Sequence, residues 1–230
     1  LIQACVSKEF AGGPGLFGGR GKTALRDFSI EIAADRPAFV AVAGESGSGK
    51  TTAARLLLGL IRPSRGSVAY RGTDLRALGA EEYRRFRKDV QAIFQDPFET
   101  FNPFYRVGHA LTVPVRTFGL AGRGSGERRL VEDALAAAGL EPGEVLGRYP
   151  RELSGGQRQR IMVARALLID PKLIVADEPV SMIDASMRAA VLGSMAALHR
   201  DRGISFVYIT HDLTTAYRMC DSIIVLYRGV

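Results

Sequence analysis

The chain has 230 residues, of which 47% are hydrophobic and 24% are charged, a composition typical of a water-soluble globular protein. Its longest apolar runs, such as Phe39–Ala43, are far too short to cross a bilayer, and its two cysteines, Cys5 and Cys220, exclude a disulfide framework or a four-thiolate metal site. The net charge of +7 is compatible with nucleic acid, anionic lipid or a polyanionic small ligand as the partner, and does not choose among them.

The first third of the chain alternates between strand and helix patterns. Residues Phe28–Ile32 alternate apolar and polar side chains, which predicts a half-buried strand. The continuous apolar run Pro37–Ala43 predicts a strand buried on both faces. A glycine-rich turn, Gly44–Gly49, follows, and then a helix over Lys50–Ile61 that Arg62-Pro63 closes. Two further short strands are predicted at Ser67–Tyr70 and Val90–Phe94.

The middle of the chain is mostly helical, and the last third alternates again. Helices are predicted over Glu127–Ala138, which Gly139 ends, and over Gln157–Leu168. Buried strands at Leu173–Ala176 and Ile204–Ile209 flank a helix over Ala185–Arg200. This pattern predicts one α/β domain over residues 1–230, with a core at roughly 1–95 and 170–230 and a helical insertion at roughly 96–169.

The turn after the buried strand fits a phosphate-binding loop. Gly44–Thr51 matches the pattern G-x-x-x-x-G-K-S/T, with a strand before it and a helix after it. Glycines let backbone N–H groups surround phosphate oxygens, and the helix N-terminus adds positive potential. Lys50 is expected to neutralise the β- and γ-phosphates of a nucleotide, and the Thr51 hydroxyl to bind Mg²⁺. An ordinary Gly/Ser turn is the alternative, but strand, loop, Lys, Thr and helix are all in place.

The strand Leu173–Ala176 ends in two acids. A carboxylate at a strand tip beside such a loop holds Mg²⁺, commonly through water, and Asp177 is expected to do this. Glu178 lies one step further and is expected to polarise a water that attacks the γ-phosphate. A surface pair of acids after a strand is the plain alternative, and the phosphate loop is what favours the functional interpretation.

Two polar residues follow other predicted strands. His211 comes just after Ile204–Ile209, at a strand end where ligands of α/β proteins collect. Gln95 comes just after Val90–Phe94. Each residue, taken alone, is more often structural than functional.

The segment Leu153–Gln157 opens an arginine-rich helix. Ser154 is predicted to be its N-cap, and the two glycines leave backbone N–H groups open to an anion. The run Leu-Ser-Gly-Gly-Gln resembles the signature of the ABC ATPases. The phosphate loop, Gln95, the signature, the acid pair and His211 also follow one another in that family's order, and the resemblance covers nearly the whole chain.

This resemblance implies a RecA-like P-loop NTPase core of α/β class, with a small antiparallel β-lobe and a helical subdomain. It implies hydrolysis of ATP with Mg²⁺ by two cassettes that meet head to tail and sandwich two ATP molecules. It assigns Gln95 to Mg²⁺, water and the link to the membrane subunits, His211 to the γ-phosphate, and Asp184 to the dimer interface. Near Asp184, Met182-Ile183 departs mildly from the family's usual Ala-Leu.

The family also stacks an aromatic residue near the N-terminus on adenine. Phe10 is expected to do so here, with Phe17 as the rival, because Ala11–Lys22 looks like a glycine-rich insertion. A phenylalanine buried in the β-lobe is the alternative.

The expected site residues fall into four groups. Those that bind nucleotide are Gly44, Glu45, Ser46, Gly47, Ser48, Gly49, Lys50, Thr51, Thr52 and Phe10. Those of the signature, which face the ATP of the opposite copy, are Leu153, Ser154, Gly155, Gly156 and Gln157. The expected catalytic residues are Glu178, His211 and Gln95. The expected Mg²⁺ ligands are Thr51, Gln95 and Asp177.

The N-terminal insertion, the run Gln95–Pro103 and Tyr149-Pro150 are similar to the oligopeptide/dipeptide importer branch, whose members also carry nickel or oligosaccharides. Thr100–Phe104 and Glu178–Asp184 lean toward relatives for oligosaccharides, which keeps that cargo as an alternative. The resemblance implies a peripheral subunit on the cytoplasmic face of the cell membrane. Its expected partners are a second ATPase subunit, identical or not, transmembrane permease subunits and, indirectly, an extracytoplasmic solute-binding protein.

Aromatic residues after Gln95 suggest where a membrane subunit docks, because exposed aromatics favour partner sites. These are Phe98, Phe101, Phe104 and Tyr105, some of which are expected to be core residues.

Two rival functions are disfavoured. DNA-associated ATPases with this signature carry long coiled coils between phosphate loop and signature, but no heptad run fills the interval between Thr51 and Ser154. No nucleic-acid partner is therefore expected. A nucleotide-binding scaffold without catalysis would lack the catalytic acid or the histidine, and Glu178 and His211 are both present.

Overall fold

The structure is a computed structural model that describes the chain apart from residues 11–21, 96–100, 123 and 182. It divides into two compact units, each described by itself below. The first unit comprises Leu1–Arg87 and Ser205–Val230, and the second comprises Lys88–Ile204. Within the described residues, no helix is both long and apolar enough to span a membrane.

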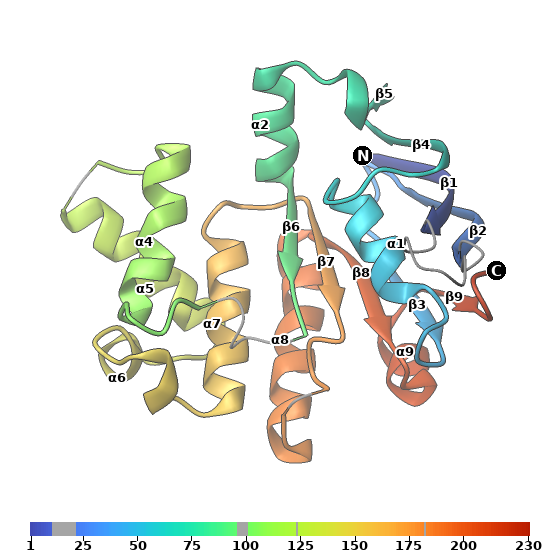
Figure 1. Cartoon of the computed structure of the whole chain (residues 1–230). Coiled ribbons are helices and arrows are strands. Elements are labelled where there is room, and N and C mark those ends of the chain that lie inside the picture. The colour runs from blue at the N-terminus through green and yellow to red at the C-terminus, as the bar shows by residue number, and fades with distance from the viewer. Residues whose placement is uncertain (11–21, 96–100, 123, 182) are drawn as a thin grey trace, which may run out of the picture. The chain divides into compact units, whose positions relative to one another are not determined.

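The first unit contains a four-stranded antiparallel sheet in the order β2-β1-β4-β5 (Figure 1). Strand β1 buries alternate residues, Ile2, Ala4 and Val6, as expected for a strand with one face on a core. This sheet is the small antiparallel β-lobe that the family resemblance implies. Its strands are β1 (Ile2–Phe10), β2 (Lys22–Ile32), β4 (Arg65–Tyr70) and β5 (Thr73–Asp74).

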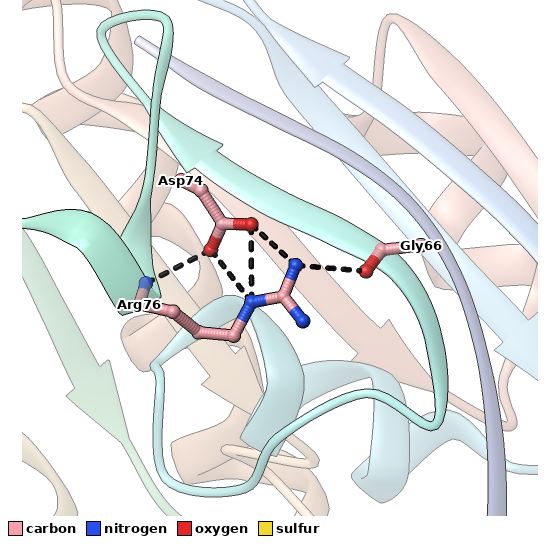
Figure 2. Close-up of polar contacts among 3 residues, drawn as sticks. All are labelled: Gly66, Asp74 and Arg76. Atoms are coloured by element: carbon pink, nitrogen blue, oxygen red, sulfur yellow. Dashed lines mark hydrogen bonds and ion pairs between the residues drawn. The ribbon is translucent and has the colours of Figure 1, made fainter.

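An exposed ion pair closes the last hairpin of this sheet (Figure 2). Asp74 accepts a hydrogen bond from the backbone N–H of Arg76 at 2.8 Å and caps a 3₁₀ turn, η1 (Leu75–Ala77). The Arg76 guanidinium also donates to this carboxylate and, at 3.4 Å, to the carbonyl of Gly66. The side-chain hydrogen bond from Arg76 lowers the pKa of Asp74, and the same bond raises the pKa of Arg76. The pair therefore joins the end of β5 to the start of β4.

The first unit also contains three parallel strands, with β3 between β8 and β9. All of Phe39–Ala43 and all of β8 are buried, as expected for strands covered on both faces. The strands are β3 (Phe39–Gly44), β8 (Ser205–Thr210) and β9 (Ser222–Leu226), and the helices of this unit include α1 (Lys50–Leu57) and α9 (Leu213–Met219). The division between the two units, at Arg87 and Lys88, lies within helix α2 (Ala80–Asp89).

The second unit pairs two parallel strands, β6 (Val90–Ile93) and β7 (Leu173–Asp177), and adds several helices. Its helices are α4 (Val107–Phe118), α5 (Ser125–Ala137), α6 (Pro142–Val145), α7 (Gly155–Leu167) and α8 (Ala185–Arg202), with a 3₁₀ turn η2 (Pro150–Glu152) before α7. In Figure 1 the helices α4 to α7 gather together.

Two polar links tie these helices. Arg116 on α4 makes a two-pronged ion pair with the buried carboxylate of Glu127 on α5, with both N···O distances at 2.8 Å. Arg160 on α7 donates at 2.7 Å to the carbonyl of Gly139, just past the end of α5.

The predicted helical insertion, roughly residues 96–169, lies inside this unit.

The predicted strands and helices are present, but some of their ends were misplaced, and β2 begins at Lys22 rather than at the predicted Phe28. The helix after the glycine loop ends at Leu57 rather than Ile61, because Gly59 adopts φ +65° and the Leu60 N–H bonds back to the carbonyl of Arg55. Strands β1 and β5 and helices α2, α4, α6 and α9 were not predicted.

Two glycines, Gly66 in β4 and Gly72 in the turn between β4 and β5, give a test of close backbone approach. Both have positive φ, but a Cβ on Gly66 would lie 1.9 Å from the carbonyl oxygen of Cys5, whereas a Cβ on Gly72 would meet nothing within 4 Å. Gly72→Ala should cost about 1–2 kcal/mol for the left-handed backbone alone. Gly66→Ala should cost roughly 2–3 kcal/mol more, because β1 and β4 must move apart. Urea unfolding of both variants measures the difference, and equal losses would show that the approach of β4 to β1 does not limit stability.

Candidate functional site

The loop from β3 to α1 is packed against the backbone of two other strands. A Cβ on Gly49, where φ is +105°, would lie 2.4 Å from the carbonyl oxygen of Ala24 on β2. A Cβ on Gly44 would lie 2.3 Å from the carbonyl oxygen of Leu226 on β9. Carbonyl oxygens cannot yield as the end of a flexible side chain can, so only glycine fits at these two positions.

Lys50 is drawn into this loop. It is 5% exposed, and its ammonium donates at 2.8 Å to the carbonyl oxygens of Gly44 and Glu45. Neither acceptor carries a negative charge, so a buried positive charge is left for an anion to balance.

The start of α1 adds donors beside that charge. Its N-cap, Gly49, has no side chain to cap the helix, and the first turn contains no acidic residue. The first N–H groups of a helix have no partner within the helix and carry the positive end of its dipole. Ser48 is 4% exposed, and its hydroxyl has no hydrogen-bond partner within the described part of the chain. Together these groups make a site that suits phosphate oxygens.

The same edge of the first unit carries His211. Parallel pairing aligns Ala43 of β3 with Thr210 of β8, so the loop and His211 both follow the carboxyl ends of neighbouring strands. Thr210 accepts a hydrogen bond from the Asp212 N–H at 3.0 Å, and Asp212 accepts from the Thr214 N–H as the N-cap of α9. The exposed His211 therefore lies between a buried strand and a capped helix.

The second unit places the other polar residues at the carboxyl ends of its own strands. Pairing aligns Ile93 of β6 with Ala176 of β7, so Gln95 and Asp177 follow at one edge. Asp177 is 6% exposed, whereas Glu178 and Gln95 are half-buried. Oxygen-bearing side chains at one sheet edge are the kind of donors that Mg²⁺ prefers.

The predicted N-cap of the signature helix is confirmed. Ser154 accepts a hydrogen bond from the Gln157 N–H at 3.1 Å, and the Gln157 side chain accepts from the Ser154 N–H at 3.0 Å. Gly156 has a further role in packing, because a Cβ there would lie 2.8 Å from the methyl carbon of Met187 on α8. Arg158, which is buried, donates at 2.9 Å to the carbonyl of Pro150 and anchors the helix to the turn before it.

The remaining expected site residues are placed as follows. Phe10 is 43% exposed at the end of β1, with the Lys8 ammonium 5.1 Å from the centre of its ring, so it is not a core residue. Its rival Phe17 lies outside the described residues, as does Met182. Asp184 is exposed at the N-cap position of α8 and makes no side-chain capping bond there. The functions of Phe10 and Asp184 stay predictions.

Two residues that sequence reasoning missed contact the expected site. Gln159 is 1% exposed, and its side-chain amide donates at 3.4 Å to the carbonyl of Phe94, the residue before Gln95. Ser181 bonds the carbonyl of Glu178. In the sequence Gln159 stands among other polar residues, Gln157, Arg158 and Arg160, so no local pattern distinguishes it. Ser181 was noted only as part of the run Glu178–Asp184.

A buried strand, a glycine loop and a helix that begins at a glycine N-cap define the class of protein: a P-loop nucleotide-binding protein with an additional antiparallel sheet and a helical segment. Solved structures place the fold more narrowly. The dimeric structure of MJ0796, described as a bacterial ABC transporter cassette, superimposes with a TM-score of 0.84 at 28% identity, over 100% of this chain and 95% of that one. A dimeric post-hydrolysis state of MJ0796 bound to ADP and Pi gives a TM-score of 0.83 with the same identity and coverage. The predicted ABC ATPase fold is confirmed.

Sequence comparisons agree. Residues 25–181 match the family model described as ABC transporter. The oligopeptide transport ATP-binding protein OppF of Salmonella typhimurium is 43% identical over 188 residues, which is 82% of this chain and 56% of that protein. The glutathione import ATP-binding protein GsiA of Salmonella paratyphi A is 40% identical over 190 residues, which is 83% of this chain and 30% of that protein. The chain belongs to the ABC transporter family, and it spans a little over half the length of the oligopeptide relatives that it matches.

Proposed function

We propose that this chain binds and hydrolyses ATP to drive solute import through an ABC transporter, most directly the import of peptides. The observation that carries the proposal is the Lys50 ammonium, buried between two neutral carbonyls at the uncapped start of α1. A triphosphate would supply the missing negative charge and accept from the loop's N–H groups.

The other residues take roles that suit their chemistry. Thr51, Gln95 and Asp177 would hold Mg²⁺ through a hydroxyl, an amide and a carboxylate oxygen, and the ion would neutralise phosphate charge when bound. Glu178 would accept a hydrogen bond from the attacking water and orient it, and His211 would donate to the γ-phosphate. Phe10 is exposed enough to stack on adenine.

The signature would complete the site of a second copy. The expected segment, Leu153–Gln157, begins a helix whose N-terminal N–H groups suit a phosphate, and Asp184 would lie at the dimer interface. The dimeric solved cassettes support this assembly.

The cargo and the other partners follow from the relatives. Several are oligopeptide transport proteins and others are glutathione import proteins, which supports peptide import over the oligosaccharide alternative. Transmembrane permease subunits would then be direct partners and an extracytoplasmic solute-binding protein an indirect one, with this chain peripheral on the cytoplasmic face of the membrane. We propose no role with nucleic acid. A salt-sensitive, nanomolar affinity of the chain for duplex DNA would contradict this part of the proposal.

The first prediction of this proposal concerns binding. Lys50→Ala should weaken the affinity for Mg-ATP at least about tenfold, because the triphosphate loses its main counter-charge. Arg55→Ala removes an exposed cation from the same helix and should leave the affinity unchanged. Isothermal titration calorimetry measures both. Because Lys50 is buried, its substitution can also destabilise the fold, so thermal melting is measured to show that the variant is folded. A folded Lys50→Ala protein with wild-type affinity for Mg-ATP would refute the site.

The second prediction concerns the composite site. Glu178→Gln should keep ATP binding and lower the hydrolysis rate by about 10²–10⁴-fold, because it removes the base that positions water. The substitution also removes a negative charge near the γ-phosphate, so unconsumed ATP should hold two chains together. Adding Ser154→Arg should prevent this ATP-driven dimer by placing bulk at the signature. Size-exclusion chromatography with light scattering, with and without Mg-ATP, reads out the dimer.

Ser154→Ala is the control for that experiment, because either substitution at Ser154 also removes the cap of α7, worth about 1 kcal/mol. The alanine variant shows how much of the effect comes from the lost hydroxyl rather than from bulk. A Glu178→Gln protein that hydrolyses ATP at the wild-type rate, or a double mutant that still dimerises with ATP, would overturn the mechanism.

The third prediction concerns the permease. Among the predicted aromatic residues, Phe104 is 85% exposed and Tyr105 is 50% exposed, Phe101 is buried, and Phe98 lies outside the described residues. Replacing Phe104 and Tyr105 together by serine should remove the transmembrane subunits from the purified complex, because exposed aromatic rings are typical interface anchors. ATP affinity of the isolated chain should not change.

Tyr217→Ser is the matched control for this surface. Tyr217 is 83% exposed on α9, outside the proposed docking segment, and its substitution should leave the complex intact. Equal loss of the permease from both variants would show that Phe104 and Tyr105 do not mark the docking site.

A further inference from the structure

Glu178 has an unusual backbone conformation. Its φ is +46°, in the left-handed region that residues other than glycine, asparagine and aspartate seldom adopt. It also precedes Pro179, and the residue before a proline is normally extended. Such a conformation persists only where the surrounding structure holds it.

Asp170 shows why Glu178 is different. It too has positive φ, +51°, and precedes a proline, but it follows the end of helix α7, where its N–H bonds to the carbonyl of Leu167 at 3.0 Å. Helices commonly end in a left-handed residue, and aspartate tolerates that region. Glu178 instead follows the last residue of strand β7, so it does not end a helix, and glutamate does not tolerate the left-handed region as aspartate does.

Ser181 provides the contacts that hold this conformation. Its hydroxyl donates at 3.0 Å, and its backbone N–H at 3.2 Å, to the carbonyl oxygen of Glu178. The two residues between them, Pro179 and Val180, are both buried, so the turn is packed as well as bonded. Two donors on one carbonyl fix the orientation of the peptide that follows Glu178.

We propose that Ser181 is a positioning residue for the Glu178 carboxylate, an inference that rests on the proposed role of Glu178 in hydrolysis. In a continuing strand, Asp177 and Glu178 would point to opposite faces of the sheet. The left-handed turn ends that alternation, and the Ser181 hydroxyl keeps the turn in place. If the carboxylate that orients the water is displaced by a fraction of an ångström, the rate of ATP hydrolysis falls. Nucleotide binding through the phosphate loop is not affected by that displacement.

The test compares steady-state ATPase kinetics of four variants with wild type. Ser181→Ala should lower kcat about 3- to 10-fold, the effect of one hydrogen bond, and leave KM for Mg-ATP within about twofold. Ser181→Thr keeps the hydroxyl and should retain kcat within about twofold. Ser194→Ala is the matched control: its hydroxyl donates to the carbonyl of Ala190 on α8, also at 3.0 Å, and its loss should leave kcat unchanged. Glu178→Gln is the reference for complete loss of the base.

The outcomes separate this inference from the function on which it rests. A nearly inactive Glu178→Gln protein beside a Ser181→Ala protein with wild-type kcat overturns the positioning role alone. So does a Ser181→Ala protein that loses only affinity, or a threonine variant as slow as the alanine variant. A Glu178→Gln protein with the wild-type rate overturns the proposed function instead, and this inference with it.

Discussion

The close packing of the phosphate loop against main-chain carbonyls is the constraint on which the first unit depends. Gly44 and Gly49 approach the backbones of β9 and β2, so the loop keeps its shape only while both strands stay in place. Hydrogen bonds join the same three segments. The Gly229 N–H donates to the carbonyl of Ser48 at 3.1 Å, and the Arg26 N–H donates to the carbonyl of Gly229 at 2.6 Å. Segments from opposite ends of the sequence therefore hold the loop that contains the buried Lys50 ammonium.

In the second unit, the signature helix α7 has a comparable central place. Its first turn is closed by the reciprocal bonds of Ser154 and Gln157, and its next residues reach three other segments. Arg158 bonds the turn before the helix, Gln159 the end of β6, and Arg160 the end of α5. Because these contacts come from consecutive residues, they lie on different sides of the helix and restrain both its position and its rotation. A displacement of α7 would therefore move or break its hydrogen bond to Phe94, the residue before Gln95.

The sequence predicts those features that follow from local rules, and it misses those that depend on tertiary contacts. The buried strands, the glycine loop and the Ser154 cap were predictable because periodicity, turn residues and capping chemistry act over a few residues. Helix α4 was missed because Pro114 lies inside it, and its N-cap position is held by Arg106, which makes no side-chain capping bond. That Phe101 is buried while Phe104 is exposed could not be predicted, because both residues lie in the same polar and aromatic run. Gly156 was predicted to leave an N–H open to an anion, but its contact with Met187 is visible only once α8 is in place.

The acid pair at the end of β7 shows how the backbone can separate the two roles proposed for similar side chains. Asp177 and Glu178 are neighbours with the same charge, so chemistry alone does not distinguish them. Asp177 belongs to a regular strand held by its pairing with β6 and is almost fully buried, an environment that suits a ligand of fixed position. Glu178 is half-buried and lies at the point where the left-handed turn begins. In the role proposed for Glu178, its carboxylate has to leave the regular alternation of the strand while its backbone stays fixed, and the left-handed turn allows both. The left-handed conformation lowers the stability of the turn, and the proposed role accounts for it by the position that it gives the Glu178 carboxylate.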